Sequence, residues 1–421
     1  MRVRTRRCGC SRSRCLSPWI TRCTASEAGQ FAAWRRQKRL QYGLIELFPN
    51  KGRLKLLKER NAGRRLLWLL AIGIVLLLGV AGCAGGSAPA EEPPAEEVIE
   101  PIVPEEPPKP EPEPEPDPGP AYTAPLTGIG RETEATVRPM AVMVNNYSTA
   151  RPQSGLPHAD VVWEVLAEGG ITRLVAIFQS DAFEDPIGPI RSIRPYLIEL
   201  GEMYHSVLAH AGASNDGYAI LQRERKPHLD EISNAGAYFW RESFRKAPHN
   251  LYSNLQKLRD GADARGYDTD VDIPALPFLT ADETVQGEPA TTLEIKFLLD
   301  NYQVSYTYDA DEGLYLREVN GEPHTDLTTE AQLSASNLVV LGADHRTLDD
   351  VGRLAIDLSS GGPAVLLRQG KAVEAKWTRP EDGGPIRIVD ESGEELPLVP
   401  GQTFYHIVPL SGSFDSHFAY E

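Results

Sequence analysis

The stretch from Cys83 to Pro120 constrains this chain most, because its composition prevents it from folding. It contains 13 prolines, and it carries 11 acidic residues against a single lysine. Such a segment buries too little apolar surface to offset the entropy lost on ordering its backbone. Proline favours the extended polyproline II conformation and like charges repel, so we expect a stiff spacer of roughly 120 Å when fully extended. The sequence therefore predicts a leader, an acidic proline-rich linker over residues 83–124, and a folded body after it.

The end of the leader has the pattern of an export signal. Residues 64–83 read "RRLLWLLAIGIVLLLGVAGC", in which two arginines precede an apolar run and small residues lead to a cysteine. The ending from Val80 to Cys83 resembles the lipobox of bacterial lipoproteins, which implies cleavage before Cys83 and lipidation of its sulfur. The alternative is a transmembrane anchor, but the run of about 15 residues is short for a bilayer. We predict a signal peptide over residues 54–82 and an anchor to the membrane through lipidated Cys83.

Residues 1–53 do not fit a signal peptide, because such leaders rarely carry some fifty extra residues with four cysteines. We interpret this basic stretch as the product of a start codon assigned too far upstream. Leu54 or Leu57 would be the true start if its codon is TTG. The alternative is a real basic extension on the cytoplasmic side of the membrane.

Charge and cysteine usage limit the class of protein. Residues 1–82 carry 18 Lys and Arg against 3 acids, and the whole chain carries a net charge of −16, so the part from Cys83 onward carries −31. This acidity argues against sequence-independent binding of nucleic acid, which requires cations to neutralise phosphates. Since Cys83 is the last cysteine of the chain, no internal disulfide is expected in the mature protein.

Residues 125–272 are predicted to form a mixed domain of the α+β or α/β class. The apolar run "RPMAVMVNN" at 138–146 indicates a buried strand. Residues 159–180 indicate two strands joined at Gly169 and Gly170, because a two-residue type I′ turn requires positive φ at both positions. On this hypothesis Glu164 and Glu168 lie on one face of the first strand, since side chains alternate with a period of two.

The stretch "IGPIRSIRPY" at 187–196 is predicted to lead into a helix. Proline is tolerated only in the first turn of a helix, so Pro195 places the start and Ser192 becomes the expected N-cap. A strand at 206–212 and a second helix from residue 218 follow. Strands interspersed with helices are typical of α/β and α+β domains.

Residues 273–421 are predicted to form a separate, mostly β domain. Turn clusters separate eight short runs that favour strands, and few helical patterns interrupt them. This pattern of short strands and turns is typical of a compact sandwich or barrel. The eight runs are "TTLEIKF", "VSYTYD", "GLYLREV", "NLVVLG", "PAVLLRQ", "KAVEAKW", "PIRIVD" and "TFYHIVP".

Long segments of the folded body resemble one bacterial family. The carrying segments are "RPMAVMVNN", "ARPQSGLPHADVVWEVLAEGGITRLVAIFQS", "IGPIRSIRPY" and "APHNLYSN". They are similar to the YerB-type lipoproteins, which are catalogued as domain of unknown function 3048 with a separate C-terminal domain. The resemblance covers the chain from about Pro125 to its end. It implies an exported lipoprotein of two domains, and it supplies no catalytic residues.

Signatures of known enzymes are missing from the mature sequence. It contains no G-x-S-x-G, H-E-x-x-H, Walker A or G-x-G-x-x-G motif. Thiol chemistry and cysteine-based zinc sites are also excluded. We therefore expect neither a cofactor nor a metal, and the sequence leaves enzymatic activity uncertain while favouring its absence.

One set of polar residues is a candidate ligand site. Arg191 and Arg194 stand at a predicted helix N-terminus, where unpaired N–H groups attract anions. His210 ends a predicted strand, a common place for site residues in α/β folds. The remaining candidates lie in loops or beside the predicted hairpin: Asn215, Asp216, His249, Asn250, Glu164 and Glu168. These residues either form a pocket for a phosphate, carboxylate or sugar, or the arginines pair with Glu164, Glu168 or Asp181 and brace the domain.

A second candidate lies in the C-terminal region. Trp377, Tyr405 and His406 could form an aromatic platform for a sugar. We favour the other interpretation, in which Trp377 anchors the core of the β domain, because a large aromatic side chain dominates burial in a small core.

The leading hypothesis is an envelope protein that binds or scaffolds rather than catalyses. It would reside on the outer face of the bacterial cytoplasmic membrane and engage a cell-wall polymer or another envelope protein. The alternative is an enzyme acting on an anionic envelope substrate, with Arg191 and Arg194 as anion clamps and His210 or His249 as acid or base. The sequence does not determine the oligomeric state.

Overall fold

The structure of the protein is a computed structural model that describes residues 120–421, with a gap at 281–282. The predicted leader, signal peptide, lipidated Cys83 and most of the linker lie outside the described residues.

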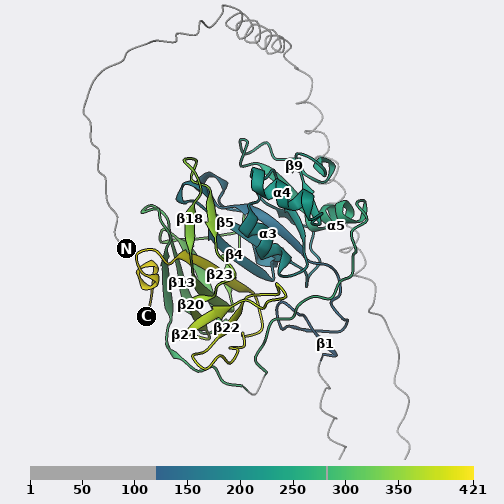
Figure 1. The fold of residues 1–421 in the computed structure, drawn as a ribbon. Helices are drawn as coiled ribbons and strands as arrows, with labels where there is room; N and C mark the ends of the chain where they lie inside the picture. Colours follow the sequence, from purple (N-terminus) through teal and green to yellow (C-terminus); the bar gives the residue numbers. More distant parts are fainter. Residues whose placement is uncertain (1–119, 281–282) are drawn as a thin grey trace, which may run out of the picture. The chain divides into compact units, whose positions relative to one another are not determined.

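A mixed, 11-stranded β-sheet runs through both halves of the described chain (Figure 1). Residues of the C-terminal half supply one part of this sheet, and residues of the N-terminal half supply the rest. Its strands are, in spatial order, β11 (Glu288–Pro289), β21 (Lys371–Thr378), β20 (Gly362–Arg368), β17 (Asn337–Ala343), β23 (Thr403–Pro409), β4 (Val161–Leu166), β5 (Thr172–Phe178), β3 (Met140–Asn145), β7 (Val207–His210) and β8 (His228–Asp230), with β22 (Arg387–Val389) paired to β21.

The central strands of this sheet are covered on both faces. β4, β5, β17 and β23 are buried along their whole length. Their sequences are correspondingly apolar runs rather than alternating patterns, which is expected when neither face meets water. Polar residues inside them therefore need partners within the protein.

Helices gather over the N-terminal strands of the sheet, as Figure 1 shows. They are α3 (Pro195–Glu202), α4 (Asn215–Arg223) and α5 (Leu255–Asp263). The apolar sides of α3 and α4 pack on one face of the sheet and that of α5 packs on the other. Gly201 allows α3 to approach closely, because a Cβ there would lie 2.3 Å from Leu208 and 2.9 Å from Ala141.

A second, six-stranded sheet packs on the same face as α5, over the C-terminal strands. Its strands bury alternate residues, as expected for a sheet with one face in water. Tyr306 and Leu293 from its inner face share a core with Val340 and Phe404 of the large sheet. The strands are β15 (Glu322–Pro323), β14 (Leu314–Val319), β13 (Gln303–Asp309), β12 (Thr292–Lys296) and β24 (Phe418–Tyr420), with β16 (Ser334–Ala335) paired to β14.

Short strands complete the described part. A three-stranded sheet is formed by β6 (Pro186–Ile187), β10 (Leu251–Asn254) and β9 (Trp240–Arg241). Two-stranded pairs are formed by β1 (Tyr122–Thr123) with β2 (Gly130–Arg131), and by β18 (His345–Thr347) with β19 (Leu354–Ile356).

Most predicted elements are confirmed. The strand at 138–146, the strand pair within 159–180, the strand at 206–212, the helix after Pro195 and the helix from about residue 218 are present. All eight runs predicted in the C-terminal region are strands, so this region is mostly β as predicted.

The prediction of a self-contained C-terminal sandwich or barrel is wrong. β17, β20, β21 and β23 continue the large sheet, and β23 pairs in parallel with both β17 and β4. Strand patterns in sequence show which residues face a core, but not which strand lies alongside which. Most of the remaining C-terminal strands form the six-stranded sheet, which packs on the large sheet.

Three local predictions are corrected. β4 and β5 are joined by the five residues 167–171, closed by a 2.7 Å hydrogen bond from Ala167 N–H to the Ile171 carbonyl, although both glycines have positive φ as expected. Glu168 lies in this connection rather than on the face of β4 that carries Glu164. The N-cap of α3 is Arg194 rather than Ser192, because Ile193 pairs with Ala213 and keeps the preceding backbone extended.

Candidate functional site

Several predicted site residues lie at one edge of the large sheet. β3, β7 and β8 are parallel, so their carboxyl ends meet at this edge. The helices α3 and α4 begin at the same edge, where Ile193 pairs with Ala213. Ligand sites of open α/β sheets lie outside the carboxyl ends of parallel strands, so the topology places the candidates where a site is expected.

Three arginines and one carboxylate lie near one another at this edge, and we call Arg173, Arg191, Arg194 and Glu168 the arginine cluster. The Nε of Arg194 forms an ion pair with Glu168 Oε1. Arg173 donates from Nη1 to the carbonyl of Ser192 at 2.7 Å, and its Nη2 lies 4.0 Å from Glu168 Oε2. Among the described residues, Arg191 has no carboxylate within 4.0 Å. The cluster therefore carries an excess of two positive charges.

Burial and mutual repulsion affect the protonation of these groups. Burial, together with the nearby charges of Arg194 and Arg191, lowers the pKa of Arg173 to about 10, although Glu168 acts in the opposite direction. Burial and the charge of Arg194 also lower the pKa of Arg191. Burial alone would raise the pKa of Glu168, but the hydrogen bond and charge of Arg194 outweigh it and lower that pKa. A bound anion would relieve this repulsion.

His249 stands close to the cluster. Its Nδ1 lies 2.8 Å from Asn145 Nδ2 at the end of β3, and its ring stacks on Tyr147 with centroids 5.4 Å apart. Burial lowers the pKa of His249, and the charges of Arg191 and Arg245 lower it further. The imidazole is therefore neutral at pH 7 and accepts a hydrogen bond from the Asn145 amide.

Three of the candidates predicted in loops remain, and two of them, Asn215 and Asp216, lie in α4 instead. Asn250 accepts a 3.1 Å hydrogen bond from Arg241 and donates one of 2.9 Å to the Glu242 carbonyl. Asn215 and Asp216 are exposed in the first turn of α4, where Ser214 caps the helix by accepting from Gly217 N–H at 3.1 Å.

His210 does not join the arginines. It is buried, with Nδ1 3.0 Å from the Gly212 carbonyl oxygen and 3.7 Å from Asp230 Oδ1, and its ring stacks on His228 at 5.5 Å. Burial lowers its pKa to about 4, although Asp230 acts in the opposite direction. The four residues of the enzymatic hypothesis therefore do not converge, because Arg194 is paired with Glu168 and His210 faces a separate cluster.

Glu164 belongs to a buried polar network on the opposite face of the sheet. Its Oε2 accepts from Arg317 Nη2 at 2.6 Å, and Oε1 accepts from Thr172 at 2.7 Å, from Asn146 at 3.0 Å and from the Tyr302 hydroxyl. Neither Glu164 nor Arg317 has any exposed side-chain surface. Burial alone would raise the pKa of Glu164, but the Arg317 charge outweighs it and holds that pKa below its ordinary value.

Arg317 extends this network toward two histidines. Its Nε donates to His324 Nδ1 at 3.0 Å, and His324 Nε2 lies 2.7 Å from Gln153 Oε1. Since Nδ1 accepts, Nε2 carries the proton and the ring is neutral, which agrees with a pKa lowered well below its ordinary value by burial and by Arg317. His406 Nε2 lies 3.1 Å from the Tyr306 hydroxyl, which also accepts from Arg317.

Sequence reasoning missed Arg317, although a signal was present. In β14 the buried positions are Tyr315, Arg317 and Val319. An arginine in phase with the apolar residues of an alternating strand indicates a buried charge with a partner. Its partner lies 153 residues away in the sequence, so the pattern could not identify it.

Of the two interpretations of Trp377, Tyr405 and His406, the favoured one, in which Trp377 anchors the core, is confirmed, and the aromatic platform is not formed. Trp377 is 1% exposed and donates from Nε1 to the Gly342 carbonyl at 2.7 Å, so it anchors the core. Tyr405 stacks on Trp163 at 4.1 Å inside the sheet, and His406 is fully buried. No ring of this set reaches solvent to stack on a sugar.

Two features are absent from residues 120–280 and 283–421, the part of the chain that the structure describes. No group of three or more His, Cys, Asp or Glu side chains in these ranges is arranged to hold a metal. No helix in the same ranges is both long and apolar enough to cross a bilayer.

Comparison with known proteins assigns the family. The profile described as "Protein of unknown function (DUF3048) N-terminal domain" matches residues 126–268, and that of the DUF3048 C-terminal domain matches residues 293–405. The chain belongs to the DUF3048 family. A Bacillus subtilis (strain 168) member named "Putative lipoprotein YerB" is 37% identical over 289 residues, which are 68% of this chain and 86% of that protein.

The DUF3048 fold is also known from a solved relative. The crystal structure of YerB protein from Bacillus subtilis has a TM-score of 0.65 to this chain at 35% identity. The matched region covers 71% of this chain and 99% of the YerB chain. In the present DUF3048 protein, the arginine cluster lies within the N-terminal match. The Glu164–Arg317 pair joins the two matched segments.

Proposed function

We propose that this DUF3048 protein is a lipid-anchored envelope protein that binds rather than catalyses, and that its arginine cluster holds an anionic group. The lipobox-like ending at Cys83 and the lipoprotein name of its relative support the anchor. The ligand class is a phosphate- or carboxylate-bearing polymer of the envelope on the outer face of the membrane.

One observation carries the binding proposal. Arg173 and Arg194 both pair with the carboxylate of Glu168 and Arg191 beside them has no carboxylate within 4.0 Å in the described chain, although the chain from Cys83 onward carries −31. Paired surface arginines are common and need no ligand. An excess of partly buried guanidinium groups is different, because each is stabilised by hydrogen bonds to an anion and arginine binds phosphate and carboxylate in a bidentate manner.

The enzymatic alternative has less support. It requires His210 or His249 to act as acid or base beside the arginines. His210 is buried against Asp230 and His228 instead. His249 is close enough for Arg191 to influence its pKa, and its Nδ1 is engaged by Asn145.

The binding proposal predicts that Arg191→Gln weakens anion binding. The full-length protein in detergent is titrated calorimetrically with inorganic polyphosphate and, separately, with poly-glutamate, which distinguishes phosphate from carboxylate recognition. We expect Kd to rise at least about tenfold, since a hydrogen bond to a charged group contributes about 1.5–3 kcal/mol and 1.4 kcal/mol is a factor of ten.

Arg223→Gln is the matched control, because Arg223 is exposed near the end of α4, outside the cluster. An equal loss for both variants would show non-specific electrostatic attraction. Tight binding that Arg191→Gln leaves unchanged would contradict the site.

A further inference from the structure

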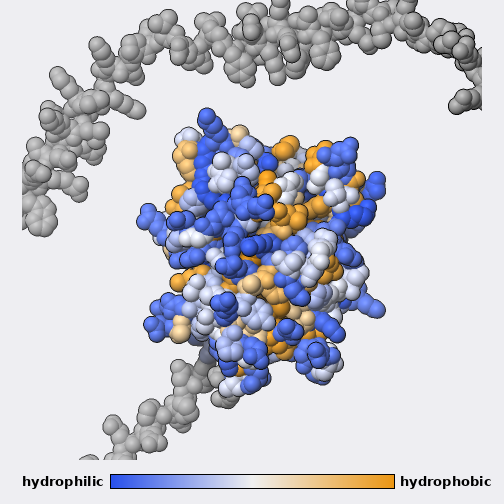
Figure 2. Space-filling model, turned by 90° about the vertical axis from the view of Figure 1, so that its left-hand side faces the viewer, coloured by the Kyte–Doolittle hydropathy of each residue, from blue (hydrophilic) through white to orange (hydrophobic). Residues whose placement is uncertain are grey.

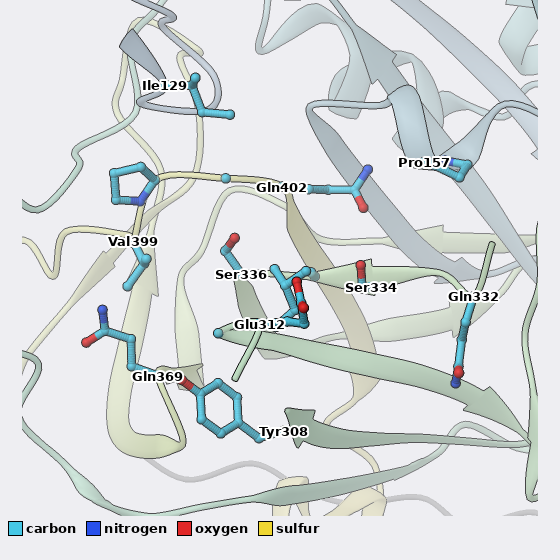
Figure 3. A pocket seen from close by; sticks show the side chains of 15 residues that line it. Ile129, Pro157, Tyr308, Glu312, Gln332, Ser334, Ser336, Gln369, Val399 and Gln402 are labelled. Carbon is cyan, nitrogen blue, oxygen red and sulfur yellow. The ribbon is translucent and has the colours of Figure 1, made fainter. Parts of the chain in front are cut away.

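A cavity of about 730 Å³ lies where the turns of the two sheets meet, away from the residues selected from sequence (Figure 3). Strand β13 contributes Tyr308, the β13–β14 turn contributes Glu312, and the β20–β21 turn contributes Gln369. The segment just before β23 contributes Gln402, which lies above Ser336 in Figure 3. Ligand cavities span roughly 300–1,000 Å³, so this one accommodates a ligand of several rings.

The polar groups of this cavity are almost all uncharged. The described lining includes three glutamine side chains and two serine hydroxyls, and Glu312 is its one charged residue. The amide of Gln332 donates to the Arg317 carbonyl at 2.8 Å, and that of Gln402 donates to the Leu156 carbonyl at 3.0 Å. These bonds orient both side chains, and their amide oxygens have no hydrogen-bond partner among the described residues.

Gly401 leaves room for the Ser336 hydroxyl in the lining of the cavity. Gly401 has φ +134, and a Cβ there would lie 1.9 Å from Ser336 Oγ. Any other residue at 401 would displace this hydroxyl. The hydroxyls of Ser334 and Ser336 have no side-chain hydrogen bond to another described residue, so both can donate to or accept from a ligand.

Tyr308 is the one aromatic residue in the described lining, whose apolar part also includes Ile129, Leu314 and Val399. Tyr308 packs against Tyr315 with ring centroids 4.9 Å apart. Gly370 permits this position, because a Cβ there would lie 3.0 Å from the Tyr308 ring. The ring is thus held by the protein while it lines the cavity.

We propose that this cavity binds a neutral oligosaccharide. Sugar hydroxyls both donate and accept, which matches amide and hydroxyl groups, and the apolar face of a sugar ring packs on an aromatic side chain. An anion is disfavoured because no lysine or arginine lines the cavity and Glu312 would repel it. An apolar ligand would leave the oriented polar groups unpaired.

An extended peptide is also a poorer fit than an oligosaccharide. A peptide that adds to a sheet needs a row of backbone groups on an edge strand. The edge strand at this cavity is β16, which has two residues, Ser334 and Ala335. The cavity is distinct from the arginine cluster, so this site does not depend on the anion-binding proposal.

The test is calorimetric titration of the full-length protein in detergent with chitotetraose, a neutral oligosaccharide of N-acetylglucosamine. We expect saturable binding that Tyr308→Ala weakens at least about tenfold, while Tyr308→Phe, which keeps the ring, stays within about threefold. Gln369→Trp fills the cavity from an exposed turn position and should abolish binding even if Tyr308→Ala fails to fold. Gln256→Ala, an exposed glutamine on α5, is the matched control.

Failure of this proposal is distinguishable from failure of the anion site. Arg191→Gln should leave chitotetraose binding unchanged, and Gln369→Trp should leave polyphosphate binding unchanged. The proposal is overturned if chitotetraose does not bind, or if folded Gln369→Trp binds it like the unmodified protein. Binding of a neutral tetrapeptide in place of the sugar would assign the cavity to peptides and equally overturn it.

Discussion

At the residue scale, Arg191 and Arg194 differ although they lie three positions apart in one motif. Arg194 is the N-cap of α3 and pairs with Glu168, which braces the connection between β4 and β5 against the helix. The backbone N–H of Arg191 donates to the Met143 carbonyl in β3, and its carbonyl accepts from Ala211 N–H. The side chain of Arg191 has no carboxylate within 4.0 Å in the described chain. The bracing hypothesis is therefore met by Arg194 and not by Arg191.

The substitution Glu168→Gln separates bracing from binding. It removes the one carboxylate of the cluster, so we expect the free energy of unfolding to fall by about 1 kcal/mol, the scale of an exposed to half-buried ion pair. The same change raises the excess charge of the three arginines, so polyphosphate affinity should increase several-fold at low salt. Calorimetric titration and chemical denaturation of the same variant measure the two effects.

The control for this substitution is Glu231→Gln, which breaks an ion pair with Arg241 outside the cluster. It should leave polyphosphate affinity unchanged. A drop in affinity for Glu168→Gln would mean that the carboxylate positions the arginines, and the excess-charge argument would then be wrong.

At the element scale, β23 holds the sheet together. It lies between β17 and β4 and pairs in parallel with both, so a strand from near the end of the chain joins elements from both matched segments. The Glu164–Arg317 pair reinforces this joint from the second sheet. Breaking a fully buried ion pair by removing one partner costs about 3–5 kcal/mol, because the other charge is left uncompensated.

We expect that neither predicted domain folds alone. Residues 120–272 would expose the edge of β4 and leave Glu164 without Arg317, and residues 273–421 would expose the parallel edge of β23. Each segment, produced separately, should lack a cooperative thermal transition by circular dichroism, whereas residues 120–421 should show one. A sharp transition for either isolated segment would support independent domains with the boundary predicted near residue 272.

At the scale of the whole molecule, polar and apolar residues are interspersed over the face shown in Figure 2. Large exposed apolar side chains such as Ile232, Phe244 and Val351 lie in separate segments. Scattered residues of this kind are normal for a protein surface. Attachment of the body to a membrane is therefore expected to rest on the proposed lipid at Cys83.

The substitution Cys83→Ala tests this attachment. A lipobox without its cysteine cannot be acylated, so the protein should leave the membrane fraction or accumulate as an uncleaved precursor. Fractionation followed by mass measurement of the N-terminus reports both outcomes. Cys23→Ala, in the predicted leader, should change neither; normal processing and membrane retention of Cys83→Ala would refute lipidation.

How much of the fold and of the site the sequence predicts depends on whether each feature is set by residues that are close together or far apart in the chain. Apolar runs and turn residues located the strands of the C-terminal region, because burial periodicity is local. Pro195 located the start of α3 within one turn, whereas Ser192 was not the cap because Ile193 pairs with a segment twenty residues later. The candidate site was partly predicted, since Arg191, Arg194 and Glu168 lie together while His210 and Glu164 belong elsewhere.

The sequence by itself determined the expected localisation, the acidic linker, the family and the positions of most strands. Only the tertiary structure decided that β23 unites the two halves, that Glu164 is neutralised by Arg317, and that Tyr308 rather than Trp377 lines a cavity. The physical reason is that these outcomes depend on contacts between residues far apart in the chain, such as Glu164 and Arg317, which are separated by 153 positions. Local patterns in a sequence encode which side chains must be buried, and they do not encode their partners.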